Sequence, residues 1–249
     1  MIYISPTGSF NNPRSDLCND AGQLVKVQIE NSFLLGWKKE DIILVTNFDY
    51  QYGDIKATVL KDVEFFDRKP QASKINAIIK MFEHGLISDN ELYWFHDLDA
   101  YQLQIITEEE IGLAEADMAL TGYGVISRWS TGIVYFKKGS LDIFKQIQQV
   151  MYKYNINEEF ALGMLTKGNK DIAERTKKLN KSYNFTPPKF TYLYSRALKP
   201  LRVAHFHILG GGGRFEVKNP VAFSKGENEL HIPLITKRLI KIFDSHGIK

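Results

Sequence analysis

The stretch Glu91–Leu103, ELYWFHDLDAYQL, places an aromatic and apolar run directly before two aspartates, Asp97 and Asp99. Such a run predicts a buried strand, and the two carboxylates stand where that strand would end. Residues two apart in an extended segment point to the same side, so both carboxylates can bind one hard divalent cation, Mg²⁺ or Mn²⁺. His96 would point to the opposite side, and we expect it to pack. The alternative is a plain strand end followed by a turn.

Two earlier apolar runs also end in polar residues. Residues 1–5, MIYIS, and residues 41–48, DIILVTNF, predict buried strands, and apolar residues at helical spacing predict helices over 20–35 and 70–84. Alternating strands and helices are typical of an α/β fold with a parallel sheet, in which ligands bind outside the carboxyl ends of the strands. We therefore expect one site to collect the polar residues at three strand ends: Ser5, Pro6, Thr7, Asn47, Asp49, Asp97 and Asp99.

The second half of the chain mixes short helices and strands. Polar residues that commonly cap helices precede several of its apolar segments. The expected elements are a short helix with a capping box of Thr107 and Glu110, strands over 117–124 and 130–139, helices capped by Ser140 and Asn157, and a late strand over 201–209.

The C-terminal segment 233–249, PLITKRLIKIFDSHGIK, predicts a basic amphipathic helix. Its apolar side would carry Ile235, Leu239, Ile242 and Phe243. We expect this helix to pack on the core. The alternative is peripheral contact with a membrane surface or a partner.

Composition limits the class of protein. The chain has 249 residues, 44% of them hydrophobic, and 32 basic against 29 acidic residues. This near balance argues against a nucleic-acid partner. A single cysteine, Cys18, excludes an internal disulfide framework and fits a reducing compartment. The N-terminus does not read as a signal peptide and the apolar runs are too short to span a bilayer, so we expect a cytoplasmic protein.

A late histidine and glycine segment is the second candidate for chemistry. His205 and His207 are two residues apart and lead into four glycines, Gly210–Gly213, followed by Arg214. Glycines let the backbone approach a ligand closely, and successive N–H groups can bind an anion. Together these residues fit a metal-bound diphosphate, whereas a flexible loop with packed histidines is the alternative.

Three further charged residues are candidates. Glu158 and Glu159 fall in the first turn of a predicted helix, where the helix dipole favours acids. Alternatively, one of them faces the cleft as a general base or an acceptor-binding carboxylate. Lys74 could neutralise phosphate charge, whereas a charge solvated at the surface is the alternative that a lone lysine favours.

These segments together resemble the nucleotide-sugar glycosyltransferases of the GT-A class. YWFHDLDA resembles the Asp-x-Asp motif of that class, WSTGIVYF its following glycine-containing strand, and NEEFALGML its acidic helix start. SYNF at 182–185 and VAHFHILGG at 203–211 resemble segments of the glycogenin-like and lipopolysaccharide galactosyltransferase-like members. The resemblance implies a Rossmann-like fold with a mixed, mostly parallel central sheet flanked by helices.

The resemblance also implies roles for individual residues. Asp99, Asp97 and the histidine, best matched by His205 with His207 as the fallback, would bind Mn²⁺ or Mg²⁺. Glu158 or Glu159 would face the acceptor or the sugar. The implied donor-binding residues are Ser5, Pro6, Thr7, Asn47, Asp49, Lys74, Asp97, Thr131, Gly132, His207, Gly210 and Arg214. The family's usual lysine-proline-tryptophan stretch is replaced by GGGGRF, so Arg214 stands where a lysine is expected.

The leading hypothesis is therefore a metal-dependent glycosyltransferase that moves a sugar from a UDP-sugar to a hydroxyl acceptor such as a glycan. We expect one domain over 1–249: a nucleotide-binding half at 1–100, an acceptor and donor-sugar half at 101–215, and an extension at 216–249. The alternatives are a nucleotidyltransferase of related fold, which would release pyrophosphate from a nucleoside triphosphate, and a non-catalytic module that binds a nucleotide sugar.

Overall fold

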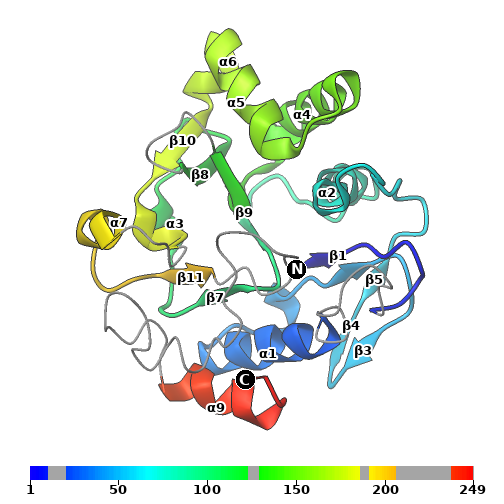
Figure 1. Cartoon of the computed structure of the whole chain (residues 1–249), viewed down its shortest axis with the longest axis vertical. Helices are drawn as coiled ribbons and strands as arrows, with labels where there is room; N and C mark the ends of the chain where they lie inside the picture. The colour runs from blue at the N-terminus through cyan, green and yellow to red at the C-terminus, as the bar shows by residue number, and fades with distance from the viewer. Residues whose placement is uncertain (11–20, 123–128, 186–190, 206–236, 249) are drawn as a thin grey trace.

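The computed structural model describes residues 1–10, 21–122, 129–185, 191–205 and 237–248. Strands form a central layer, and helices cover it on two sides (Figure 1). One helical side consists of α1 (Ala21–Leu34) and α9 (Lys237–Ser245), which lie next to each other. The other consists of α2 (Ser73–Glu83), α4 (Leu141–Tyr154) and α5 (Glu158–Gly168). The short helices are α3 (Glu108–Ile111), α6 (Lys170–Glu174) and α7 (Thr191–Arg196).

The strands pair in both directions. A parallel sheet has the order β1 (Ile2–Tyr3), β2 (Val45–Thr46), β5 (Thr58–Val59). A second sheet has the order β10 (Thr176–Leu179), β8 (Met118–Gly122), β9 (Trp129–Phe136), β6 (Tyr93–His96), in which β10 and β8 are parallel and the other pairs antiparallel. Two antiparallel pairs complete the layer: β7 (Ala100–Gln102) with β11 (Val203–His205), and β3 (Gln51–Tyr52) with β4 (Ile55–Lys56).

Two apolar clusters join the helical layers to the strands. α1 and α9 bury Leu24, Ile29 and Phe243 against residues around β7, with the ring of Tyr101 4.8 Å from that of Phe243. α2, α4 and α5 pack on β6, β8 and β9 through a separate cluster. The α/β fold predicted from the sequence is confirmed.

Strand pairing differs from expectation at β6, the strand that leads into Asp97 and Asp99. The parallel arrangement holds for β1 and β2, whereas β6 forms its ladder with β9 in the antiparallel direction, Phe95 opposite Val134. The reason is that the apolar run of β6 specifies a strand but not its neighbour, and the longer β9 supplies the matching edge. The two N-terminal strands are also shorter than their apolar runs.

Helix ends test the predicted caps. Asn157 accepts a hydrogen bond from the Phe160 N–H at 3.1 Å, as predicted. Thr107 caps α3 through the Glu110 N–H, but the Glu110 carboxylate binds Arg202 rather than closing a capping box. Ser140 precedes α4 without capping it, because its hydroxyl donates to the carbonyl of Lys137 at 2.7 Å.

The C-terminal helix packs on the core. The apolar residues Leu239, Ile242 and Phe243 of α9 are buried, and Arg238 donates to Asn31 of α1. Packing, the first of the two alternatives, is therefore what the structure has for this side of the helix; Ile235 lies outside the described residues. None of the helices in the described parts of the chain combines the length and apolar character needed to cross a bilayer.

Candidate active site

Asp97, Asp99 and His205 form the centre of the candidate site. Each offers one ligand atom, and these atoms all lie within 4.8 Å of one another. His205 Nε2 lies 3.1 Å from Oδ1 of Asp99, and both of these residues are buried. Two carboxylates and an imidazole are a donor set that fits a divalent cation. The structure thus brings together the three residues that the sequence analysis assigned to the metal.

Backbone pairing explains how residues more than a hundred positions apart meet. β11 lies antiparallel to β7 with His205 opposite Ala100, which places the histidine beside Asp99. The Asp97 N–H donates to the carbonyl of Gly132 at 2.8 Å and so extends the ladder between β6 and β9. The Ala100 N–H donates to the Asp97 carbonyl at 3.1 Å. The two carboxylates are therefore presented from a turn that hydrogen bonds hold on both sides.

A buried lysine links the cluster of Asp97, Asp99 and His205 to α5. Lys74 of α2 places Nζ 3.0 Å from Oδ1 of Asp97 and 3.3 Å from Oε1 of Glu158. Burial disfavours the lysine charge, but Asp97 and Glu158 outweigh burial and the pKa of Lys74 lies above its ordinary value. Thr131 of β9 donates to the same Glu158 oxygen at 2.7 Å. The lysine therefore stays charged and holds two carboxylates in place.

The cluster concentrates negative charge. Burial raises the pKa of Asp97, the Lys74 ammonium opposes that shift, and the Asp99 carboxylate adds to it. Burial would lower the pKa of His205, but the Asp99 carboxylate outweighs burial and raises it. Both shifts reflect carboxylates crowded together, with the Asp99 side chain 10% exposed and that of Asp97 33% exposed, an arrangement that a cation would relieve.

Gly132 has no side chain, and the ring of His205 occupies the space that a side chain would fill. A Cβ atom on this residue would lie 2.3 Å from Cε1 of His205 and 3.0 Å from Oδ2 of Asp97. The first distance is far shorter than van der Waals contact and the second is slightly shorter, so any side chain at this position would displace the ring. The sequence analysis placed Gly132 near the donor sugar, and the structure places it against the side chains of His205 and Asp97.

The first two strand ends meet each other through hydrogen bonds. The Ser5 N–H donates to Oδ1 of Asn47 at 3.0 Å, and Nδ2 of Asn47 donates to the Ser5 carbonyl at 2.7 Å. The Ser5 hydroxyl lies 3.1 Å from that of Thr7. Pro6, Thr7 and Asp49 are exposed. This pair of strand ends thus forms a polar ledge, and the meeting of Ser5 with Asn47 agrees with one part of the prediction that three polar strand ends share a site.

Glu159 lies next to a lysine that the sequence analysis did not single out. Burial lowers the pKa of Lys181 to about 8, the charge of Lys178 adds to that shift, and the Glu159 carboxylate opposes it. Glu159 is itself 9% exposed. No local pattern marks Lys181, which is half-buried at the start of a 3-10 helix, Lys181–Tyr183.

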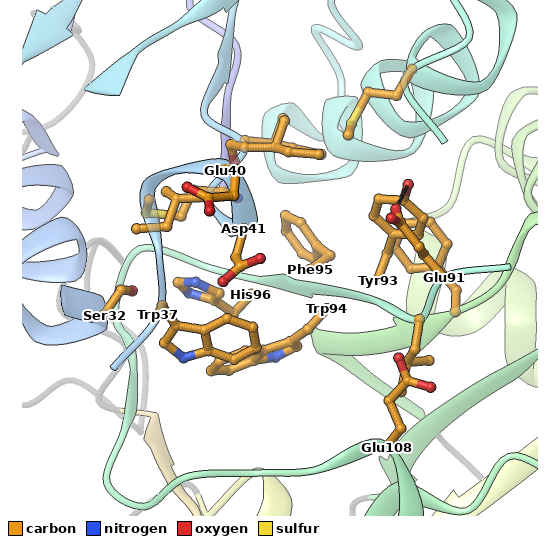
Figure 2. Close-up of a pocket in the computed structure, with 17 residues that line it drawn as sticks. Ser32, Trp37, Glu40, Asp41, Glu91, Tyr93, Trp94, Phe95, His96 and Glu108 are labelled. Atoms are coloured by element: carbon orange, nitrogen blue, oxygen red, sulfur yellow. Dashed lines mark hydrogen bonds between the residues drawn. The ribbon is translucent and has the colours of Figure 1, made fainter. Parts of the chain in front are cut away.

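The side chain of His96 faces away from the cluster of Asp97, Asp99 and His205. Its ring lies 4.6 Å from that of Trp94, and the residue lines a pocket of about 360 Å³. Figure 2 shows Trp37 and Trp94 among the other residues that line this pocket. Burial lowers the pKa of His96 to about 3, so the ring is neutral at physiological pH. The prediction that His96 packs, because it alternates with the aspartates along the strand, is confirmed.

Three predicted donor-binding residues, His207, Gly210 and Arg214, lie outside the described residues, as does Cys18. Conversely, two residues of the site were given no role from the sequence. Asn184 lies within the quoted segment SYNF, and Ser130 lies within WSTG; both touch the site only through long-range contacts. The signal available in the sequence was that both lie in segments that resemble those of the GT-A class.

Comparison with known proteins relates the fold to enzymes of sugar transfer. No protein-family model and no curated protein matches the chain. Solved structures do match. The galactosyltransferase LgtC, in complex with donor and acceptor sugar analogs, has a TM-score of 0.58 at 15% identity, with 91% of this chain and 92% of that chain covered.

Two further structures have the same fold. A glycosyltransferase involved in the glycosylation of the major capsid of PBCV-1 has a TM-score of 0.52 at 13% identity, covering 83% of this chain and 93% of that one. The apo form of the glycosyltransferase GlyE of Streptococcus pneumoniae TIGR4 also has a TM-score of 0.52, at 14% identity, covering 91% and 61%. At these identities the likeness establishes the fold, and the predicted GT-A fold is confirmed.

Proposed function

We propose that this protein is a metal-dependent glycosyltransferase that moves a sugar from a nucleoside-diphosphate sugar, a UDP-sugar, to a hydroxyl group of an acceptor such as a glycan. The observation that carries the proposal is the cluster of Asp97, Asp99 and His205 at a strand end of a GT-A fold. Fold alone does not determine function, so the proposal rests on the chemistry of this cluster.

The residues present fit a divalent cation. Asp99 would hold it from the turn before β7 and His205 from β11, and Asp97 would bind it directly or through water, with Mn²⁺ or Mg²⁺ as the ion. A mixed carboxylate and imidazole donor set favours Mn²⁺, because Mg²⁺ prefers oxygen ligands alone. A cation bound here would neutralise charge on the leaving nucleoside diphosphate.

The chain's own residues orient the donor in this proposal. The ledge of Ser5 and Asn47, with Pro6, Thr7 and Asp49, would line the nucleotide pocket. Lys74 would add positive charge beside the diphosphate while it holds Asp97 in place, and Thr131 and Gly132 would lie near the donor sugar. His207, Gly210 and Arg214 keep their proposed place at the diphosphate.

Glu158 and Glu159 are proposed to act on the sugar and the acceptor. Oε1 of Glu158 accepts from Thr131 and pairs with Lys74, whereas its Oε2 is buried and has no hydrogen-bond partner among the described residues. A buried carboxylate oxygen calls for a donor, and a sugar hydroxyl would supply one. Glu159, beside it on α5, is the candidate general base for the acceptor hydroxyl.

Turnover of UDP-sugars tests the proposal. We expect release of UDP from at least one UDP-sugar in the presence of Mn²⁺, a loss of about 10²-fold or more after chelation, and recovery when Mn²⁺ is restored. The measurement is UDP release over a panel of UDP-sugars with and without acceptor glycans. Pyrophosphate release from a nucleoside triphosphate, or UDP binding without any turnover, would contradict the proposal in favour of a nucleotidyltransferase or a binding module.

Glu158→Gln tests the sugar contact. Glutamine keeps the size of the side chain and an acceptor for Thr131, but it removes the charge that Lys74 and a sugar hydroxyl would meet. We expect kcat/KM to fall about 30-fold, which corresponds to about 2 kcal/mol for a hydrogen bond to a charged group. Steady-state kinetics would measure it, with Glu115→Gln at an exposed position as the control. Equal activity of the two variants would remove Glu158 from the site.

A further inference from the structure

The buried side-chain amide of Asn184 contacts His205 at the ring nitrogen that does not face Asp99. Oδ1 of Asn184 lies 3.1 Å from Nδ1 of His205, and Nδ2 of Asn184 donates to Oγ of Ser130 at 2.9 Å. Asn184 is 1% exposed and both partners are 2% exposed. In the structure the amide presents its oxygen to the ring nitrogen of His205 and its NH₂ group to the Ser130 hydroxyl, so both of its ends have a partner.

The backbone around this amide is also held. The Phe185 N–H donates to the Val203 carbonyl and the His205 N–H donates to the Phe185 carbonyl, both at 2.9 Å. These bonds lay the segment of Asn184 alongside β11. The amide and the imidazole are therefore fixed relative to each other at both the backbone and the side chain.

The orientation of the amide determines which ring nitrogen can bind a cation. A neutral imidazole carries one N–H, and a carbonyl oxygen facing Nδ1 keeps the proton there. When a cation is bound, the lone pair is on Nε2, the nitrogen that lies 3.1 Å from Oδ1 of Asp99 and belongs to the cluster; without a cation, a proton on Nε2 would donate to that carboxylate instead. Hydrogen-bond partners of this kind orient ligating histidines and raise their basicity as ligands.

We propose that Asn184 is a positioning residue: anchored by Ser130, it accepts the Nδ1–H of His205 and so directs Nε2 toward the cation shared with Asp97 and Asp99. This inference rests on the proposed metal-dependent function and adds to it a residue that touches neither the cation nor the substrate. It also gives a role to Ser130 of β9, which anchors Asn184. The next two residues of the strand serve the same site, because Thr131 donates to Glu158 and Gly132 leaves space for the His205 ring.

The test measures Mn²⁺ binding by the full chain without substrate. The electron paramagnetic resonance signal of free Mn²⁺ reports the binding during a titration. Asn184→Leu keeps the size of the side chain and removes the acceptor, and we expect Mn²⁺ affinity to fall 10- to 100-fold, as is typical for the loss of such a partner. Asn184→Asp keeps an acceptor, and we expect affinity within about threefold of the wild type. Ser130→Ala, a milder change, should weaken binding by less than Asn184→Leu.

Controls separate this role from a general effect on folding. Asn90→Leu at an exposed position should bind Mn²⁺ as the wild type does, and circular dichroism should report a folded Asn184→Leu chain. Should Asn184→Leu misfold, Ser130→Ala decides: unchanged Mn²⁺ affinity in that variant overturns the role.

The outcomes also distinguish this inference from the proposed function. Wild-type affinity in a folded Asn184→Leu chain, or equal weakening in Asn184→Asp, would overturn the positioning role while leaving Asp99-dependent sugar transfer intact. A wild-type chain that binds no Mn²⁺ would overturn the metal site and this role together. In activity assays we expect Asn184→Leu to raise the Mn²⁺ concentration needed for half-maximal rate, with a smaller change in kcat at saturating Mn²⁺.

Discussion

Asp99→Ala is expected to reduce UDP-sugar turnover about 10³-fold or more. Asp99 is 7% exposed, and it contributes the carboxylate nearest to the His205 ring in the cluster. Without it, Asp97 and His205 remain, and Lys74 already holds Asp97. A bound cation supplies several kcal/mol of stabilisation to a leaving group, and about 4 kcal/mol corresponds to that loss of rate.

Two measurements accompany this variant. Mn²⁺ affinity should fall in parallel with turnover, which would separate the loss of a ligand from the loss of the fold. Asp89→Ala is the matched control, because its carboxylate is 75% exposed and its ion pair within the described residues is with Lys138 at the surface. If Asp99→Ala turned over UDP-sugars at the wild-type rate, the metal-dependent mechanism would be untenable.

Gly132→Ala is expected to lower turnover about 10²-fold through a single methyl group. The new Cβ would lie 2.3 Å from Cε1 and 2.9 Å from Nδ1 of His205. That ring cannot move freely, because Asn184 and Asp99 hold its two nitrogens and the surroundings are buried. A displacement of about 1 Å in a reacting site costs on the order of 10² in rate.

The same substitution should lower the free energy of unfolding by about 1 to 3 kcal/mol, the usual cost of overpacking. Gly168→Ala is the matched control, since a Cβ there would meet nothing within 4 Å. Thermal unfolding, Mn²⁺ titration and UDP release of both variants measure the effect. Wild-type Mn²⁺ affinity in Gly132→Ala would contradict the placement of His205 above this glycine.

The alternative for the aspartate pair, a plain strand end and turn, is partly right. The hydrogen bond from the Ala100 N–H to the Asp97 carbonyl does make a turn there. The turn and the site are the same feature, because the turn directs both carboxylates toward His205. The dipole explanation for Glu158 and Glu159 also holds, since both lie in the first turn of α5, yet Glu158 additionally pairs with Lys74.

Local features of the sequence determined a large part of this protein. The apolar run before Asp97 produces β6, alternation along the strand turns His96 away from the aspartates, and Asn157 begins α5 by capping it. These outcomes depend on residues within one strand or one helical turn of each other. Interactions of such short range can be inferred from spacing and residue type alone.

Only the tertiary structure decided the remainder. The antiparallel pairing of β6 with β9, the meeting of His205 with Asp99, and the hydrogen bond from the amide of Asn184 to Ser130 each join residues tens of positions apart or more. Strand partner and register are chosen by the packing of whole layers, and local sequence does not encode them. The two carboxylates could therefore be predicted from thirteen residues and His205 only through the family resemblance, whereas the contact between them and its support by Asn184 required the folded chain.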